Sequence, residues 1–438
     1  MLTGTELVKA MYQKAILDAD NRRKDEAGKL LDYYNDSSLS YILDDIRARY
    51  VHPEKLYPCS VNIVKKIVRA LAMVYMRDAV RSVDGTEQDK AILAEIETTA
   101  AMPVKMKQAN RMAKLLGTIL LRPVWRNGRM DLDVLTPDVL DVETGDTPQD
   151  LQAVQVTHYS ATGNANEVTY ALWTPETVQI MDANGRQISE EENPYKRLPF
   201  VPCWRHPVGD VFWQHGASDL LMIQDAVTRL LTLASYTLDF QGFSTCYVKG
   251  AEGRLADDVA MGPGSLVGLP RDGEIGYVSP QAPVEKILAV VDFLLKQAAV
   301  TNGLPAATMS TEPTEESGVS RIVGGQETQE MRADDVALFA EYERQLFDVF
   351  RTVWNVHNPG RQISADAVFQ INFADPRPTM TATEQISNWE RLMALGLASP
   401  VDAVMERDPD LTRDEAKARL LMIRDEMAEF GTNFVLPT

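Results

Sequence analysis

Three carboxylates close together are the side chains of this chain best suited to catalysis. Asp138, Asp141 and Glu143 lie on a stretch rich in β-forming residues. Carboxylate oxygens bind hard cations, and a bound cation of this kind can activate water for hydrolysis of DNA. However, no lysine follows closely, and residues 136–148 also read as an acidic turn. A metal-dependent, DNA-processing nuclease and an ordinary turn are the two interpretations of this stretch.

Other catalytic motifs are missing from the sequence. It has no GxxxxGK[ST] loop and no HExxH pair, and Gly216-Ala217-Ser218 lacks the second glycine of a nucleophile elbow. The three cysteines form no CxxC pair, and the five histidines are scattered, which is more typical of surface and packing residues than of metal ligands. We therefore expect no enzyme activity, no cofactor and no metal.

The composition is that of a folded protein with a strong acidic excess. Apolar residues make up 45% of the 438 residues, and 44 Lys+Arg against 63 Asp+Glu leave a net charge of −19. This charge argues against a protein that wraps duplex DNA by neutralising phosphates, but not against one through which DNA slides. The N-terminus lacks the features of a signal peptide, and no apolar run is long enough to span a membrane, so we expect synthesis in the cytoplasm.

The first half of the chain reads as helices followed by an antiparallel β region. Helical patterns cover Leu2 to about Arg77 and Val104 to Leu116, the second with a basic face that we interpret as solvated or intersubunit. After Gly117 the period changes to that of strands. The predicted strands are Thr118 to Trp125, Arg129 to Leu135, Leu151 to Ser160, Glu167 to Thr174 and Thr177 to Met181. An α+β fold follows.

The second half alternates long helices with a small β insert. Helices are predicted over Ser218 to Gln241, Pro283 to Asn302 and Val319 to His357, the last with a weak point at Gly324-Gly325. On the second helix, five apolar residues are expected to share one face: Ile287, Val290, Val291, Leu294 and Leu295. The insert is too small to bury a core alone, so we expect copies of neighbouring subunits to complete it. A strand over Val368 to Phe373 and three short helices end the chain.

A polar loop lies between the second and third of these helices. Its central residues are Thr308, Met309, Ser310, Thr311, Glu312, Pro313, Thr314, Glu315, Glu316 and Ser317. Such a composition is typical of a flexible surface loop, and equally of a mobile loop held at a functional face. Composition does not choose between the two.

Three short motifs lie before, or at the start of, the series of long helices. They are Tyr57-Pro58-Cys59-Ser60-Val61-Asn62-Ile63-Val64-Lys65-Lys66-Ile67-Val68, Pro199-Phe200-Val201-Pro202 and Gly216-Ala217-Ser218-Asp219-Leu220. With the order helix, β insert, helix, polar loop and long helix, they resemble the portal proteins of tailed bacteriophages over nearly the whole chain. Such proteins form the ring, generally of twelve subunits, at the unique capsid vertex.

The resemblance implies a division of the chain into parts of a portal subunit. The expected parts are a wing (1–216), a first stem helix (217–241), a clip (242–282), a second stem helix (283–302), a tunnel loop (303–318), a long helix with a returning wing strand (319–375) and a helical crown (376–438). The tunnel loop would expose Thr308, Met309, Ser310, Thr311, Glu312, Thr314, Glu315 and Glu316 to passing DNA. Lys286 and Lys296 either form positive rings in the channel or are simply solvated. Lys249, Arg254 and Arg271 of the clip either face DNA or form salt bridges to docking partners.

The resemblance also implies partners and a location. We expect a homo-oligomeric ring in the virion that serves genome packaging and ejection. Its expected partners are the terminase large subunit, head-tail adaptor proteins, the major capsid and scaffolding proteins, and double-stranded DNA passing without sequence readout, with no membrane. Two alternatives stay open: the nuclease that uses Asp138, Asp141 and Glu143, and a head-tail adaptor or scaffold that never touches DNA.

Overall fold

The computed structural model describes most of the chain. The described residues are 11, 18–49, 57–159, 167–241, 245–249, 274–278, 284–310, 326–374, 382–408 and 411–429. The chain divides into two compact units, the first made of residues 1–315 and 323–374, the second of residues 316–322 and 375–438. The predictions for Gly324-Gly325 and for Leu2 to Ala10 lie outside the described residues.

Helices come first in the large unit, as expected. They are α2 (Asp18–Tyr34), α3 (Leu39–Arg49), α4 (Ile63–Leu71), α5 (Glu87–Thr99) and α6 (Met102–Leu116). Helix α4 is amphipathic and begins at Asn62, whose side chain accepts a hydrogen bond from the Lys65 N–H. Two buried N–H groups at this helix start, those of Ile63 and Val64, are bound from another element. The Gln224 side-chain oxygen accepts from the Ile63 and Val64 N–H groups at 3.1 Å each.

Two antiparallel sheets follow these helices and confirm the α+β class. Strands β2 (Thr118–Arg126), β3 (Arg129–Leu135) and β9 (Val201–Trp204) form a sheet of order β3-β2-β9. Strands β4 (Leu140–Thr144), β5 (Leu151–His158), β6 (Thr169–Trp173), β7 (Thr177–Met181) and β8 (Gln187–Glu192) form a five-stranded meander in chain order. Five of these strands match the predicted β segments. Strand β9 overlaps the motif Pro199-Phe200-Val201-Pro202, whereas β4 and β8 were not predicted.

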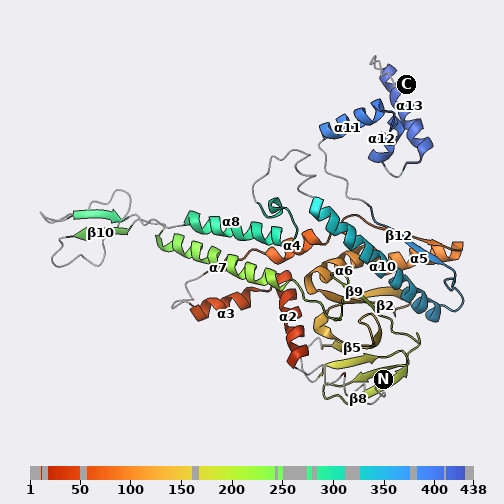
Figure 1. Ribbon diagram of the computed structural model, residues 1–438, viewed down its shortest axis with the longest axis horizontal. Coiled ribbons are helices and arrows are strands. Elements are labelled where there is room, and N and C mark those ends of the chain that lie inside the picture. The colour runs from red at the N-terminus through yellow and green to blue at the C-terminus, as the bar shows by residue number, and fades with distance from the viewer. Residues whose placement is uncertain are drawn as a thin grey trace. The chain divides into compact units, whose positions relative to one another are not determined.

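The final predicted strand of the large unit is confirmed as β12 (Val368–Asn372), and its partner was not predicted. It pairs antiparallel with β1 (Val80–Asp84), so a strand near residue 80 is joined to one near residue 370. The long helix α10 (Gln326–His357) precedes β12 and carries a row of fully buried side chains into the main core. Figure 1 shows α10 beside β2, β9 and α6.

The two long helices before α10 are close to their predicted bounds. Helix α7 covers Ser218–Gln241 and α8 covers Val284–Thr301. Between them in the chain lies a two-stranded hairpin of β10 (Thr245–Lys249) and β11 (Glu274–Val278), and after α8 comes a 3₁₀ turn, η4 (Ala306–Met309). None of the described helices is long and apolar enough to cross a membrane.

The second unit contains three short helices, as the sequence predicts. They are α11 (Ala382–Ala394), α12 (Pro400–Arg407) and α13 (Arg413–Glu429). Ser399 and Asp402 form a reciprocal capping box at the start of α12. Among the described residues of this unit, Ala416 alone is buried. The described part of this unit therefore buries almost no core of its own in a single subunit.

Two glycines allow the start of α7 to lie against the junction of α6 and β2. Gly117 has φ of +83°, and a Cβ at this position would lie 2.4 Å from the Gln214 carbonyl oxygen. At Gly216 a Cβ would lie 2.6 Å from the Leu115 carbonyl oxygen. The Ala217 N–H donates to that same Leu115 oxygen at 2.8 Å. Two backbone segments, 115–117 and 214–217, are thus in direct contact.

Candidate interface helices and channel positions

Helices α7 and α8 form an antiparallel pair (Figure 1). Each contributes a face of buried residues, with Val227 and Ala234 on α7 and Val291, Ala298 and Ala299 on α8. The three alanines permit close approach of the helix backbones. Among the five apolar residues predicted to share a face of α8, Val290 lies at the edge of that face. Val290 is 47% exposed, because it lies about 100° from Val291 around the helix.

The face of α8 directed away from its buried side carries a regular stripe. Lys286, Val290, Phe293, Gln297 and Val300 follow one another at alternating spacings of four and three residues, the heptad pattern of helices that pack together. Phe293 is 59% exposed and Val300 54%. We call these five residues the α8 seam. Three exposed apolar side chains in one stripe, Val290, Phe293 and Val300, are typical of an interface with another chain.

The two lysines predicted to line the channel differ in their surroundings. Lys296 donates to Asp292, one turn earlier, at 2.7 Å, so its charge is already compensated. Lys286 is exposed, and the described part of the chain offers it no ion pair. Their separation of ten residues turns them about 80° apart around the helix. A single row of positive charge on α8 therefore does not contain both.

Three of the eight predicted loop residues fall in the described part of the loop. Pro305 leads into the turn η4, and Met309 at its end is only 6% exposed and belongs to the main core. The predicted exposure of Met309 is therefore wrong in the single subunit. Thr308 and Ser310 are half-buried. The other five predicted positions, Thr311, Glu312, Thr314, Glu315 and Glu316, lie outside the described residues.

Of the three residues predicted in the clip, the structure describes only the backbone of Lys249. Lys249 ends β10, where it is paired in register with Glu274 at the start of β11. Arg254 and Arg271 lie outside the described residues. The hairpin itself agrees with the expected β insert.

The carboxylate cluster does not form a metal site. Asp141 is almost fully buried and is bound by two cations, Arg23 at 3.0 Å and Lys24 at 2.7 Å, both from α2. Its charge is therefore satisfied by the protein itself. Within the residues that the structure describes, no group of three or more His, Cys, Asp or Glu side chains is arranged to hold a metal. The stretch around Asp141 instead contains strand β4, which Arg23 and Lys24 of α2 bind through this carboxylate.

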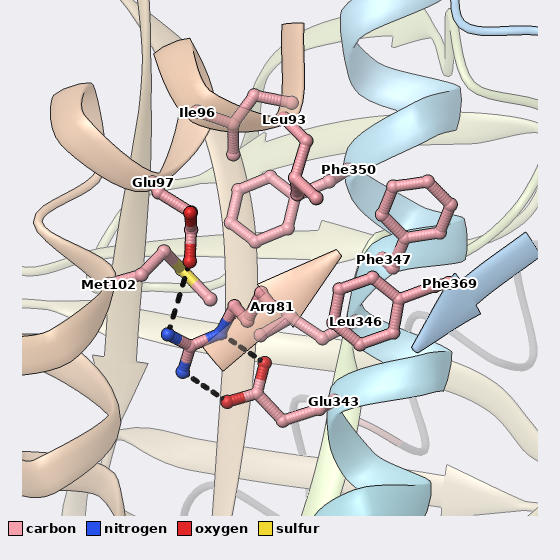
Figure 2. A pocket seen from close by; sticks show the side chains of 10 residues that line it. All are labelled: Arg81, Leu93, Ile96, Glu97, Met102, Glu343, Leu346, Phe347, Phe350 and Phe369. Carbon is pink, nitrogen blue, oxygen red and sulfur yellow. Dashed lines mark hydrogen bonds and ion pairs between the residues drawn. The ribbon is translucent and has the colours of Figure 1, made fainter. Parts of the chain in front are cut away.

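A buried ion pair fixes α10 against β1 (Figure 2). The Arg81 guanidinium donates to both carboxylate oxygens of Glu343, through Nε at 2.9 Å and Nη2 at 2.5 Å. Its Nη1 contacts Glu97 of α5 at 3.4 Å, and the Tyr75 hydroxyl donates to Glu343 at 2.7 Å. Burial alone would lower the pKa of Arg81, but hydrogen bonding and charge from Glu343 raise it. Burial, followed by the charge of Glu343, raises the pKa of Tyr75.

A second buried pair corrects the prediction for the basic face of α6. Lys114 is 4% exposed and donates to Asp335 of α10 at 2.7 Å, so it is neither solvated nor available to another subunit. Burial raises the pKa of Asp335 despite this contact. Sequence reasoning missed Lys114, Arg81 and Glu343 as partners, because each pairing joins residues far apart in the chain. The heptad spacing of the α8 seam, by contrast, can be recognised in the sequence alone.

Comparisons with known proteins found one family and several solved structures to which this chain is similar. The protein family described as "Phage portal protein, SPP1 Gp6-like" matches residues 13–428. Among solved structures, a chain from "Neck of empty GTA particle computed with C6 symmetry" is 13% identical, with a TM-score of 0.50, over 78% of this chain and 89% of that one. A chain from "Virion of native gene transfer agent (GTA) particle" is also 13% identical, with a TM-score of 0.47, over 83% and 91%. No curated protein matches.

Proposed function

The chain belongs to the phage portal protein family, whose members form the ring at the unique vertex of a capsid, and we propose that its ring is the conduit for genome packaging and ejection. The protein is thus a virion component. The match to this family over residues 13–428 is the observation that carries the proposal. The work of such a ring is mechanical and electrostatic, with weak, replaceable contacts to phosphates and no readout of bases.

The parts of the chain take the roles that the family layout gives them. Residues 1–216 with the β1–β12 pair form the wing, α7 and α8 the stem, and the β10–β11 hairpin the clip. Residues 303–318 form the tunnel loop and α11 to α13 the crown. The exposed apolar residues of the crown, including Leu395 and Leu397, support this reading, because a ring of copies would cover them.

Within the ring, the α8 seam packs against a helix of the adjacent subunit. Val290, Phe293 and Val300 supply its apolar residues. A ring of twelve is the stoichiometry that we propose. The ring also serves as the docking platform for the terminase large subunit, head-tail adaptors and capsid and scaffolding proteins.

Negative-stain electron microscopy and native mass spectrometry of the purified protein test the proposal. We expect rings with a central hole for the wild type and for Phe293→Leu, which keeps an apolar side chain. Phe293→Lys should leave folded subunits that fail to form rings, because a lysine in the seam would be desolvated without a partner. Compact wild-type monomers with divalent-dependent cleavage of DNA would instead support the nuclease.

A different result would distinguish an adaptor that never touches DNA from a portal. Rings that bind terminase but show no DNA passage in a packaging assay would support the adaptor. Wild-type rings that package DNA support the portal.

A further inference from the structure

Strand β5 carries two buried polar side chains on the face that is directed toward α2. Gln155 is fully buried and Thr157 is 6% exposed. Both lie on one face of the strand, because side chains of residues two apart in a strand point the same way. Gln155 is paired in register with Asp141 of β4, which Arg23 and Lys24 of α2 bind. This face therefore lies at the junction of the five-stranded sheet with α2.

A short 3₁₀ turn, η2 (Pro137–Val139), brings Asp138 to the same junction. The turn leads directly into β4, at the point where that strand begins to pair with β5, and it is in contact with both α2 and β5. Burial raises the pKa of Tyr159, and the charges of Asp138 and Asp141 raise it further. Both carboxylates thus act on the residue that follows Thr157 on this face of the strand.

Three oxygen atoms at this junction have no hydrogen-bond partner among the described residues. They are Oε1 of Gln155, Oγ1 of Thr157 and Oδ1 of Asp138, and each is almost inaccessible to solvent. The Nε2 atom of Gln155 lies 3.5 Å from the Asp141 carboxylate, so Oε1 is the amide atom left over. Nearly all buried polar atoms in folded proteins have a partner. Three exceptions at one junction point to a bound ligand outside the polypeptide.

The charges around these oxygen atoms favour a neutral ligand. Asp141 binds two cations, Arg23 at 3.0 Å and Lys24 at 2.7 Å, and both would repel a metal ion placed beside them. An anion would instead meet the acceptor oxygens of Asp138 and Gln155. A water molecule satisfies both conditions, because it accepts a hydrogen bond from a hydroxyl and donates two to acceptor oxygens.

We infer that one ordered water molecule accepts a hydrogen bond from the Thr157 hydroxyl and donates to Gln155 Oε1 and Asp138 Oδ1. Buried waters typically make about three hydrogen bonds, which is the number available here. This water connects β5 to turn η2 and completes the junction with α2. The stretch that the sequence suggests as a metal site therefore binds a neutral ligand. The inference does not depend on the proposed ring.

Cryo-electron microscopy of the full-length protein, at a resolution that reveals ordered waters, tests the inference directly. We expect one density peak at about 2.7–3.2 Å from each of the three oxygen atoms. The peak should persist when choline replaces every metal cation in the buffer. A peak that disappears in choline would assign a cation and overturn the inference. A direct contact between Thr157 and Asp138, with no peak between them, would also overturn it.

Urea unfolding of variants tests the bridge independently. Thr157→Val keeps the shape of the side chain but removes the hydroxyl, so it should lower the folding equilibrium constant about tenfold. Thr157→Ser, the matched control, keeps the hydroxyl and should lower the constant less. Asp138→Ala removes one acceptor of the same water. The double variant Thr157→Val/Asp138→Ala should therefore lose at least about threefold less than the product of the two single losses. Single losses that multiply would show that the two residues share no ligand.

Discussion

Removing one member of the Arg81–Glu343 pair should destabilise the large unit by several kilocalories per mole. Both side chains are 1% exposed, so the Arg81 charge is solvated by Glu343 and Glu97, and the Glu343 charge by Arg81 and Tyr75. Glu343→Gln keeps the size of the side chain but leaves the Arg81 cation with Glu97, at 3.4 Å, as its nearest carboxylate. Breaking a buried pair in this way costs about 3–5 kcal/mol, and we expect a loss in that range.

A variant in which both residues are replaced distinguishes the loss of the ion pair from the cost of leaving one charge buried without its partner. Arg81→Met leaves the Glu343 carboxylate buried, and it should cost about as much as Glu343→Gln. Replacing both residues by methionine removes both charges, and the free energy of unfolding should then fall by less than about 2 kcal/mol, well below the sum of the single losses. Arg344→Ala is the matched control on the same helix. Its partner Glu341 lies at 2.6 Å but both are more than half exposed, so the loss should stay below about 0.5 kcal/mol.

Urea unfolding followed by tryptophan fluorescence measures these differences. The assay uses a Trp389→Phe background, because Trp389 is the one tryptophan of the six that lies in the second unit. The remaining tryptophans then report the large unit, among them buried Trp354 on α10. If the free-energy losses of the two single variants sum to the loss of the double variant within about 0.5 kcal/mol, Arg81 and Glu343 are not coupled and this reasoning is refuted.

Three further predictions follow from named contacts. Gly117→Ala should lower the melting temperature more than Gly128→Ala in a thermal scan, since both have positive φ but Gly128 has open space around it; equal shifts would contradict the close approach. Burial lowers the pKa of His357, so its neutral form is favoured in the folded state, and its stabilising effect is lost as pH falls below about 6.5. An NMR titration of His357 should show a midpoint below about 6.5, and a midpoint above that value would contradict this prediction. Lys286→Glu should impair DNA packaging more than Lys296→Glu, because Asp292 already compensates Lys296; equal effects in a packaging assay would argue for a shared row of charge.

The helices and most strands were predictable because their hydrophobic periods are local. The bounds of α7, β3 and β7 agree with prediction to the residue. Strand β1 was missed because it is five residues long and its partner β12 lies nearly three hundred residues later. Strand β8 was missed because its sequence, QISEEE, is an exposed, acidic edge without alternation between apolar and polar residues.

The candidate site was less predictable because its residues depend on distant partners. A basic residue on a helix looks the same in sequence whether it faces water or, like Lys114, a buried carboxylate 221 positions away. On α8 both faces carry apolar residues, so periodicity alone could not separate buried Val291 from exposed Val290. Tertiary packing against α7 makes that distinction.

The contact between segments 115–117 and 214–217 has a mechanical consequence. The Ala217 N–H donates to the Leu115 carbonyl at 2.8 Å, and the two glycines remove the side chains that would separate the backbones. Side-chain contacts can absorb a displacement by changing rotamer, whereas backbone contacts of this kind have no such freedom. A force applied along α7 would therefore be transmitted to the α6–β2 junction with little displacement. This junction is thus a rigid support for the helix.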